Sequence, residues 1–387
     1  MKAGYITEEH EMLRASFRKF LKREALPYYE EWEKKGEVPR AFWRKLGEQG
    51  YLCPWLSETY GGMEADFGYS VIINEELEKV GTGLIGVGLH NDIVVPYLEA
   101  YGTEEQKTRW LPKCVTGEVI TAVAMTEPGA GSDLAGIRTT AVKKNDTYVM
   151  NGEKTFITNG IHADLIVVVC KTDPQASPPH KGISLFVVER GTHGFSRGRK
   201  LEKVGLHSQD TAELVFEDAI VPSSQLLGKE GEGFYYLMNQ LQQERLIVGI
   251  GAVAACERML EITVDYVTQR QAFGRSIASF QNTQFKLAEL HTEIEIGRTF
   301  LNRTIEAHMQ GEDVVKEVSM SKWWTTELVK KTAMECMQLH GGYGYMEEYE
   351  IARRFRDAPV TAVYAGSNEI MKTIIAKKMG LGGSKHE

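Results

Sequence analysis

Apolar residues recur along the chain with two different spacings, and the changes between them divide it into three parts. Up to about residue 118, and again from about residue 231, they recur every three to four positions, as at Leu13 and Phe17, which is typical of amphipathic helices. From residue 119 to about residue 221, short β-branched runs alternate with turns, which is typical of strands. The pattern therefore predicts helices, then strands, then helices.

The first third carries several helix signals. Thr7 has the residue type of an N-cap, and Glu8 follows in the first turn, where the helix dipole favours a negative charge. Further helices are expected over Pro39–Gln49, Tyr69–Val80, Ile85–Tyr101 and Thr103–Thr116. We therefore predict that residues 1–118 form an all-α domain.

The middle third reads as strands. Asn151-Gly152-Glu153 separates two strand-like runs and is a hairpin signal. Three further strands are expected over Leu165–Cys170, Ile183–Val188 and Glu213–Phe216. Residues 119–230 are thus predicted to form a small antiparallel β domain.

The last third contains long helical stretches. One is expected over Gly233–Gln269, a second carries Leu287 to Ile305 at helical spacing, a third covers Val314–Leu339, and a fourth follows Gly366. Long helices joined by short turns favour a four-helix bundle over residues 231–387. The fold class is therefore α+β multidomain.

Composition narrows the possible partners. The chain has 387 residues and a net charge of -8, with no long basic run, so we expect no nucleic-acid partner. Its longest apolar run, Leu165 to Cys170, is too short to span a bilayer. Five scattered cysteines without a C-x-x-C pair predict neither disulfides nor a metal site. The acidic start lacks a signal-peptide core, which favours a cytoplasmic protein, with a mature mitochondrial matrix form as the alternative.

The stretch Ile120–Asp133, ITAVAMTEPGAGSD, is where a cofactor is expected. It runs from strand-like residues into a turn with two glycines, which lets the backbone approach a flat ligand closely. Leu134 stands where a dinucleotide fingerprint has its third glycine, so the Rossmann interpretation fails. The chain has no phosphate loop of the G-x-x-x-x-G-K-[ST] type and no G-x-S-x-G nucleophile elbow.

Three motifs together carry a resemblance to one family. Ala124–Asp133 looks like the flavin and substrate signature of the acyl-CoA dehydrogenases. Arg270-Gln271-Ala272-Phe273-Gly274 with Phe280-Gln281 resembles their second signature, and Gln338–Gly344 their third. The order and spacing match over nearly the whole chain.

The resemblance implies an FAD enzyme that oxidises an acyl-CoA thioester to the trans-2-enoyl-CoA and passes electrons to an electron-transferring flavoprotein. It also implies a homo-oligomer, with a tetramer expected. The residues implied at the isoalloxazine ring are Val123, Met125, Thr126, Gly131, Ser132, Phe156, Ile157 and Thr158. Those implied for the rest of FAD, often from a neighbouring subunit, are Arg270, Phe273, Gln281, Gln338, Leu339, Gly341, Gly342, Ser367 and Asn368. Many relatives carry Trp where this chain has Phe156.

The catalytic base departs from a common pattern. Many family members carry it in a Tyr-Glu-Gly-Thr segment, but the matching stretch here is Tyr364-Ala365-Gly366-Ser367. The reaction needs a carboxylate close to the carbon beside the thioester. Glu369 and Glu244 are the two candidates, and we favour Glu244, whose Glu-Arg-Leu context resembles the long-chain and isovaleryl branches.

Substrate contacts are expected from Ser132, Gln242, Arg245, Ala365, Gly366 and Gly88. Gly86 and Gly88 are expected to leave room for a medium, long or branched acyl chain. Two alternatives stay open: an oxidase that uses oxygen, and a non-catalytic flavin-binding descendant, which the vacancy at Ala365 suggests.

Overall fold

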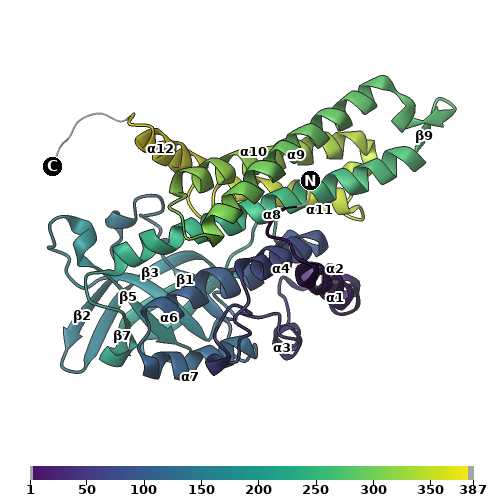
Figure 1. Cartoon of the computed structure of the whole chain (residues 1–387). Coiled ribbons are helices and arrows are strands. Elements are labelled where there is room, and N and C mark those ends of the chain that lie inside the picture. The colour runs from purple at the N-terminus through teal and green to yellow at the C-terminus, as the bar shows by residue number, and fades with distance from the viewer. Residues whose placement is uncertain (1–2, 382–387) are drawn as a thin grey trace.

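The computed structural model describes residues 3–381 and consists of an N-terminal helical part, a central sheet and a C-terminal group of long helices (Figure 1). The first helix starts as expected, because Thr7 caps it and accepts a hydrogen bond from the His10 N–H. The N-terminal helices are α1 Glu8–Glu24, α2 Tyr29–Lys35, α3 Arg40–Glu48, α4 Phe67–Val80, α5 Ile85–Gly88, α6 Val95–Tyr101 and α7 Glu104–Val115.

The helix expected over Ile85–Tyr101 is interrupted, which corrects that prediction. A π-helical segment, Leu89–Val94, separates α5 from α6. Pro96 lacks the N–H that would bond to the carbonyl of Asp92 in a regular helix. The side chain of Gln243 donates to that carbonyl instead, at 2.8 Å. The irregular segment is therefore held by a contact from the C-terminal helices.

The central sheet has the strand order β6-β7-β3-β2-β4-β5-β8, with β1 paired to β4. Most pairs are antiparallel, but β1 and β2 each meet β4 in parallel, which the sequence did not reveal. The strands are β1 Thr121–Ala124, β2 Thr140–Lys144, β3 Thr147–Thr158, β4 Leu165–Lys171, β5 Ile183–Glu189, β6 Phe195–Lys200, β7 Thr211–Pro222 and β8 Leu226–Leu227.

The hairpin expected at Asn151-Gly152-Glu153 is wrong, because β3 runs straight through it. Gly152 has φ 145° and marks a register shift against β7, and a Cβ there would lie 2.5 Å from Thr139 Oγ1. The glycine thus serves a bulge rather than a turn. The tight turn lies earlier, between Lys144 and Thr147, which are paired across β2 and β3.

The C-terminal part contains three long helices, with α11 and α12 packed against α10 (Figure 1). Its elements are α8 Gly233–Gln269, β9 Gln271–Ala272, β10 Arg275–Ser276, α9 Gln281–Met309, α10 Val315–Leu339, α11 Glu350–Asp357 and α12 Asn368–Lys378. The β9–β10 ribbon closes the tip of the α8–α9 pair, far from the sheet (Figure 1). No helix among residues 3–381 is long and apolar enough to cross a membrane.

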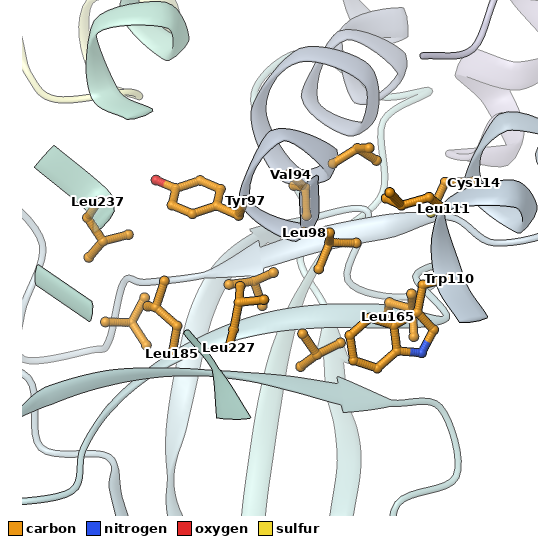
Figure 2. Close-up of a cluster of buried hydrophobic side chains, with 14 of the residues drawn as sticks. Val94, Tyr97, Leu98, Trp110, Leu111, Cys114, Leu165, Leu185, Leu227 and Leu237 are labelled. Carbon is orange, nitrogen blue, oxygen red and sulfur yellow. The ribbon is translucent and has the colours of Figure 1, made fainter. Parts of the chain in front are cut away.

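One apolar cluster joins all three parts (Figure 2). Trp110 of α7 lies beside Leu165 of the sheet. Tyr97 and Leu98 of α6 belong to the same cluster as Leu185, and Leu237 reaches it from α8. Burying large apolar side chains of this kind stabilises by about 1.5–3 kcal/mol each. This packing fixes α6 against the first turns of α8.

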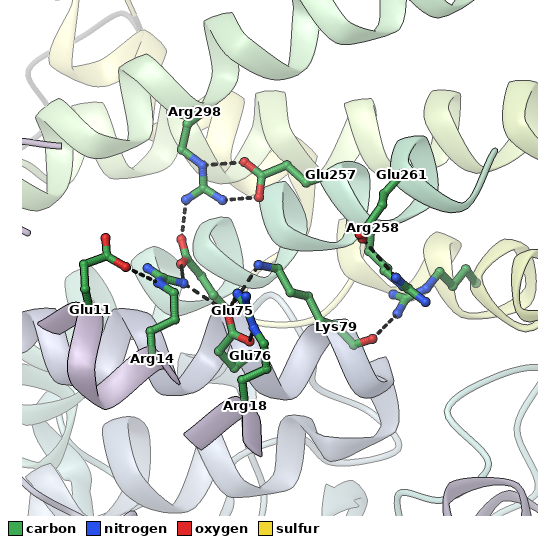
Figure 3. Close-up of polar contacts among 11 residues, drawn as sticks. Glu11, Arg14, Arg18, Glu75, Glu76, Lys79, Glu257, Arg258, Glu261 and Arg298 are labelled. Atoms are coloured by element: carbon green, nitrogen blue, oxygen red, sulfur yellow. Dashed lines mark hydrogen bonds and ion pairs between the residues drawn. The ribbon is translucent and has the colours of Figure 1, made fainter. Parts of the chain in front are cut away.

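A chain of ion pairs joins α4 to α1 and to the long helices (Figure 3). Glu75, on α4, pairs with Arg14 of α1 and with Arg298 of α9, and Arg298 also binds Glu257 of α8. Burial alone would raise the pKa of the Glu75 carboxyl, but the two arginines hold it below its usual range. The network holds α4 in a fixed position beside α8.

Candidate active site

The end of β1 and a bulge in β3 form one side of the site. Phe156 has φ 60°, an unusual backbone conformation for an aromatic residue, and its side chain is 68% exposed although its neighbours Thr155 and Ile157 are buried. The N–H of Thr155 donates to the carbonyl of Thr126 at 2.9 Å, so the bulge lies against the turn after β1. Together they expose an aromatic side chain beside a polar loop.

A buried ion pair, which the sequence pattern did not predict, supports this arrangement. Lys154 is fully buried, and its Nζ donates to Glu127 Oε1 at 2.8 Å and to the carbonyl of Met125 at 3.0 Å. Glu127 also accepts the N–H groups of Arg138 and Thr139. Burial would raise the pKa of Glu127, but Lys154 lowers it overall. The only sequence feature that pointed to this ion pair was a lysine within the alternating pattern of β3.

The turn itself is open. Neither Gly129 nor Gly131 would place a Cβ within 4 Å of another residue, and Ser132 is exposed. Ile157, by contrast, belongs to the buried core of the sheet. Val123 and Met125 are partly buried against the apolar cluster of Figure 2.

A cavity lies between α4, α5, α8 and α11. Ile247, Val248 and Gly251 form its wall on α8, and Thr158 and Ala365 also line it. The wall on α8 continues to Met259, twelve residues after Ile247, which is about 18 Å along the helix. Most of the other walls are aliphatic, from Leu77, Leu84, Ile85, Leu89 and Ile93.

The room expected at Gly86 and Gly88 is not there, which corrects that part of the prediction. A Cβ on Gly88 would lie 2.1 Å from Asn74 Oδ1, and one on Gly86 would lie 2.3 Å from Gln209 Oε1. Both glycines are needed for close packing, and neither lines the cavity. Their neighbours Ile85 and Leu89 line it instead.

Glu244 lies one turn before the part of α8 that lines the cavity. It is 5% exposed, and the hydroxyl of Tyr97 donates to its Oε1 at 2.6 Å. Burial raises the pKa of Glu244 to about 7, against the smaller lowering effects of Tyr97 and Arg245. A carboxyl with a pKa near neutrality is suited to taking a proton.

The neighbouring residues of α8 differ in what they contact. Arg245 is buried, its Nε has no hydrogen-bond partner among the described residues, and it lies 4.0 Å from the Cβ position of Gly366. Gln242 instead donates to His308 Nδ1 and accepts the N–H of Val314, so its side chain is committed to the α9–α10 connection. The structure thus brings Arg245, but not Gln242, to the loop of Ala365.

The loop that contains Ala365 and Gly366 is held by a hydrogen bond from α10. Both residues have positive φ, 53° and 87°. The buried Lys322 donates to the Gly366 carbonyl at 2.8 Å and to Asn368 Oδ1 at 3.0 Å. Asn368 is therefore bound internally. Burial, with Arg245 adding to it, lowers the pKa of Lys322 to about 8.

Glu369, the other candidate base, is exposed. Hydrogen bonds from its own N–H and from Ser367, which precedes α12, lower its pKa. These are the properties of a carboxylate in the first turn of a helix. The geometry therefore separates the two candidates, and Glu244 is the one beside the cavity.

The residues of the second and third motifs lie at another place. Arg270, Gln338, Leu339, Gly341 and Gly342 line one hollow together. Arg270 is exposed, with its guanidinium 5.4 Å from the ring centre of Tyr343, and the two glycines would place no Cβ within 4 Å of another residue.

Phe273 is 95% exposed with φ 52°, and Gln281 is exposed at the start of α9. This group lies at the tip of the α8–α9 pair, far from β1 and β3 of the same chain (Figure 1). An exposed guanidinium and open glycine backbone suit an anionic ligand, and exposed Phe156 suits a flat ring. The residues present therefore fit FAD, but in two separate places. No group of acidic, His and Cys side chains arranged to hold a metal occurs within residues 3–381.

Comparison with known proteins agrees with this organisation. Three family models match: acyl-CoA dehydrogenase N-terminal domain over residues 7–118, middle domain over 122–219 and C-terminal domain over 231–380. The long-chain specific acyl-CoA dehydrogenase of Rattus norvegicus is 48% identical over 373 residues, which is 96% of this chain and 87% of that protein.

Solved structures show the same fold. An acyl-CoA dehydrogenase from Geobacillus kaustophilus superposes with a TM-score of 0.98 at 69% identity and covers 98% of this chain and 100% of its own. One from Bacillus anthracis, complexed with FAD, superposes with a TM-score of 0.91 at 33% identity, over 98% of this chain and 68% of its own. The chain belongs to the acyl-CoA dehydrogenase family, whose members are flavoprotein oxidoreductases that act on acyl-CoA.

Proposed function

We propose that the protein binds FAD and uses Glu244 to start the α,β-dehydrogenation of an acyl-CoA thioester, giving the trans-2-enoyl-CoA. The observation that carries the proposal is Glu244 itself, a buried carboxyl with a pKa of about 7 beside a largely aliphatic cavity. A buried carboxyl tuned toward neutral pH is the arrangement expected of a general base.

The residues of this chain divide the work in the following way. Glu244 takes the proton from the carbon next to the thioester carbonyl, and Tyr97 orients the carboxylate by donating to Oε1. The cavity wall of α8 holds the acyl chain and keeps water away from it. When bound, FAD would supply the acceptor for the hydride that leaves the adjacent carbon.

FAD would lie with its ring against Phe156 and the turn of Thr126, Gly131 and Ser132. Phe156 is exposed on a strained bulge, and the turn glycines leave their surface open, which supports this placement. Arg270, Phe273, Gln281 and the Gln338–Gly342 segment would hold the rest of FAD from a second copy of the chain. The long separation between the two groups in one chain supports a homo-oligomer (Figure 1).

The preferred substrates are proposed to be longer acyl chains, with electron-transferring flavoprotein as the electron acceptor. Support for longer chains comes from the extended aliphatic wall, since each buried CH₂ contributes about 0.8 kcal/mol to binding. The 48% identity to a long-chain specific enzyme points the same way.

The test is anaerobic titration of the FAD-loaded protein with straight-chain and branched acyl-CoAs while the flavin absorbance is followed. We expect bleaching, and Glu244→Gln should slow it by about 10²-fold or more while leaving FAD bound. Glu369→Gln is the matched control and should bleach at the wild-type rate.

Each other outcome has a distinct meaning. Bleaching by Glu244→Gln at the wild-type rate would remove Glu244 from the mechanism. Bound flavin that no acyl-CoA bleaches would favour a non-catalytic role, and rapid re-oxidation by air would favour an oxidase.

A further inference from the structure

One part of the cavity is polar, although most of its walls are aliphatic. Glu78 of α4, Arg354 and Asp357 of α11, and Tyr364 all line it, and we call these four residues the polar wall. Glu78 Oε2 lies 3.9 Å from the Cβ position of Gly251 on α8. Gly251 is seven residues beyond Glu244, or about 10 Å along the helix. The polar wall therefore lies beside the distal part of a chain whose reacting carbon is at Glu244.

Two carboxylate oxygens of the polar wall have no donor. Asp357 is 2% exposed; its Oδ1 accepts the N–H of Leu206 at 2.7 Å, but its buried Oδ2 has no hydrogen-bond partner among the described residues. Glu78 Oε1 accepts from Thr82 at 2.7 Å and from Arg354 at 3.2 Å, whereas no hydrogen bond within residues 3–381 reaches Oε2. Buried polar atoms in native proteins normally have partners, so a donor is expected in this part of the cavity.

The charges of the polar wall favour a neutral donor. Arg354 pairs with Glu78, and Arg356 Nε lies 3.8 Å from Asp357 Oδ1, so a further cation would be repelled by these two guanidinium groups. A carboxylate would be repelled by Glu78 and Asp357. Burial raises the pKa of Glu78 to about 7 and that of Asp357 to about 6, so each acid gains from a hydrogen bond to its charged form. Tyr364, whose hydroxyl donates no hydrogen bond to a described residue, can serve a ligand oxygen that accepts.

A hydroxyl group meets both requirements, because it donates one hydrogen bond and accepts another. We propose that the polar wall binds a hydroxyl group on the distal part of the acyl chain, so that this cavity selects acyl-CoA thioesters hydroxylated near the end of the chain. The proposal rests on the proposed function, since it assigns the same cavity to the acyl chain. It adds a substrate class and the residues that recognise it.

The test compares matched pairs of thioesters from eight to sixteen carbons, roughly the range that the length of α8 beside the cavity allows. Each plain acyl-CoA is paired with its analogue hydroxylated on the last carbon. Two quantities are measured on the FAD-loaded protein: kcat/KM for flavin reduction, and the dissociation constants of the corresponding trans-2-enoyl-CoAs by calorimetry. At the best chain length, the hydroxylated member should bind about tenfold more tightly, the order expected of one hydrogen bond to a charged group.

Tyr364→Phe removes the donor to the hydroxyl, and Asp357→Asn replaces the charged acceptor by a neutral amide. Each change should reduce the preference to about twofold or less. The readout is the ratio within each variant, so a general loss of stability or turnover cancels. Asp265→Asn makes the same chemical change at an exposed position of α8 and should keep the full preference.

Equal binding of plain and hydroxylated chains by the wild type at every length would overturn the proposal and would show that the polar wall holds only water. A preference that survives in both variants would also overturn it. If no thioester of either kind reduces the flavin, the proposed function has failed rather than this assignment. An analogue with a terminal carboxylate should bind more weakly than the plain chain.

Discussion

Burial and a hydrogen bond shift the pKa of Glu244 in opposite directions. Burial raises its pKa to about 7, and the Tyr97 hydroxyl at 2.6 Å favours the charged form and so limits that rise. Glu244 must be ionised to accept a proton. Activity should therefore increase with pH through the pKa of this carboxyl, and Tyr97 should determine where the increase falls.

Tyr97→Phe removes the donor and leaves the ring in the apolar cluster. The pKa of Glu244 should then rise, and the acidic limb of the kcat/KM profile should move to higher pH, by about one unit for a hydrogen bond to a charged group. Activity should be reduced at neutral pH and should recover in alkaline buffer. Tyr101→Phe, which changes the next tyrosine of α6, is the control. A uniform loss at all pH values would mean that Tyr97 only supports the packing.

Ala365 stands where many relatives carry the catalytic Glu. This position therefore permits a second test of which side chains can reach the reacting carbon. Ala365 lines the cavity, and its loop lies next to Arg245, the neighbour of Glu244. If a carboxylate from either position can reach the reacting carbon, adding Ala365→Glu in a Glu244→Gln background should restore part of the flavin reduction. The rescue should be partial and should favour short chains, since the new side chain occupies the cavity.

Anaerobic bleaching rates of the single and double variants with short and long acyl-CoAs measure this rescue. Ala365→Ser in the same background is the control, because it adds a polar hydroxyl group without a carboxylate. A double variant that holds FAD but reduces it no faster than Glu244→Gln would place Ala365 away from the reacting carbon.

Among whole elements, β3 is the one whose departure from regularity builds the site. Its bulge turns Phe156 outward, while Lys154 on one side and Ile157 on the other stay inside. The ion pair of Lys154 with Glu127 then ties the bulge to the turn after β1. Breaking a buried pair from one side leaves an uncompensated charge, which costs about 3–5 kcal/mol.

Lys154→Met should therefore lower the melting temperature and weaken FAD binding, because Glu127 loses its partner and the carbonyl of Met125 loses a donor. Lys144→Met, at an exposed position of β2, is the matched control. Thermal unfolding and fluorescence titration with FAD provide the two readouts. Unchanged FAD affinity in a stably folded Lys154→Met protein would separate the ion pair from the cofactor site.

The spacing of residues along the sequence predicted most helices and the candidate base. It could not predict contacts between residues that are distant in the sequence. Helical periodicity identified α8 nearly to the residue, and motif similarity selected Glu244 over Glu369, whose exposed position agrees with that choice. The hairpin at Gly152 was wrong because glycine has the same signature in a bulge and in a turn. The prediction of free space at Gly88 was wrong because the space left by a missing side chain can be filled by a neighbouring residue, here Asn74. Tyr97 lies 147 positions from Glu244, so no local pattern could reveal their contact.

In the whole molecule, the two groups of proposed cofactor residues lie in separate places, so we expect each FAD to be bound between two subunits (Figure 1). Phe156 is on the sheet, whereas Arg270 follows α8 at the tip of the long helices (Figure 1). Phe273 is almost fully exposed beside Arg270, as expected of an aromatic residue that a second subunit covers. If two subunits build each FAD site, a subunit altered in one group of residues should still form an intact site with a subunit altered only in the other group.

Mixed oligomers test this directly. Arg270→Ala removes a charge-assisted contact to a phosphate and should lower FAD occupancy, and Lys154→Met should lower it through the other group. When the two variants are co-expressed with different tags and the mixed oligomer is isolated, each pair of sites contains one with both groups intact and one with both altered. FAD content and activity should then rise above either variant alone, toward half of the wild-type value. Mixed oligomers of Arg270→Ala with itself are the control and should show no gain. If the mixed species of the two variants binds no more FAD than its parents, Arg270 acts on the FAD of its own chain or on none.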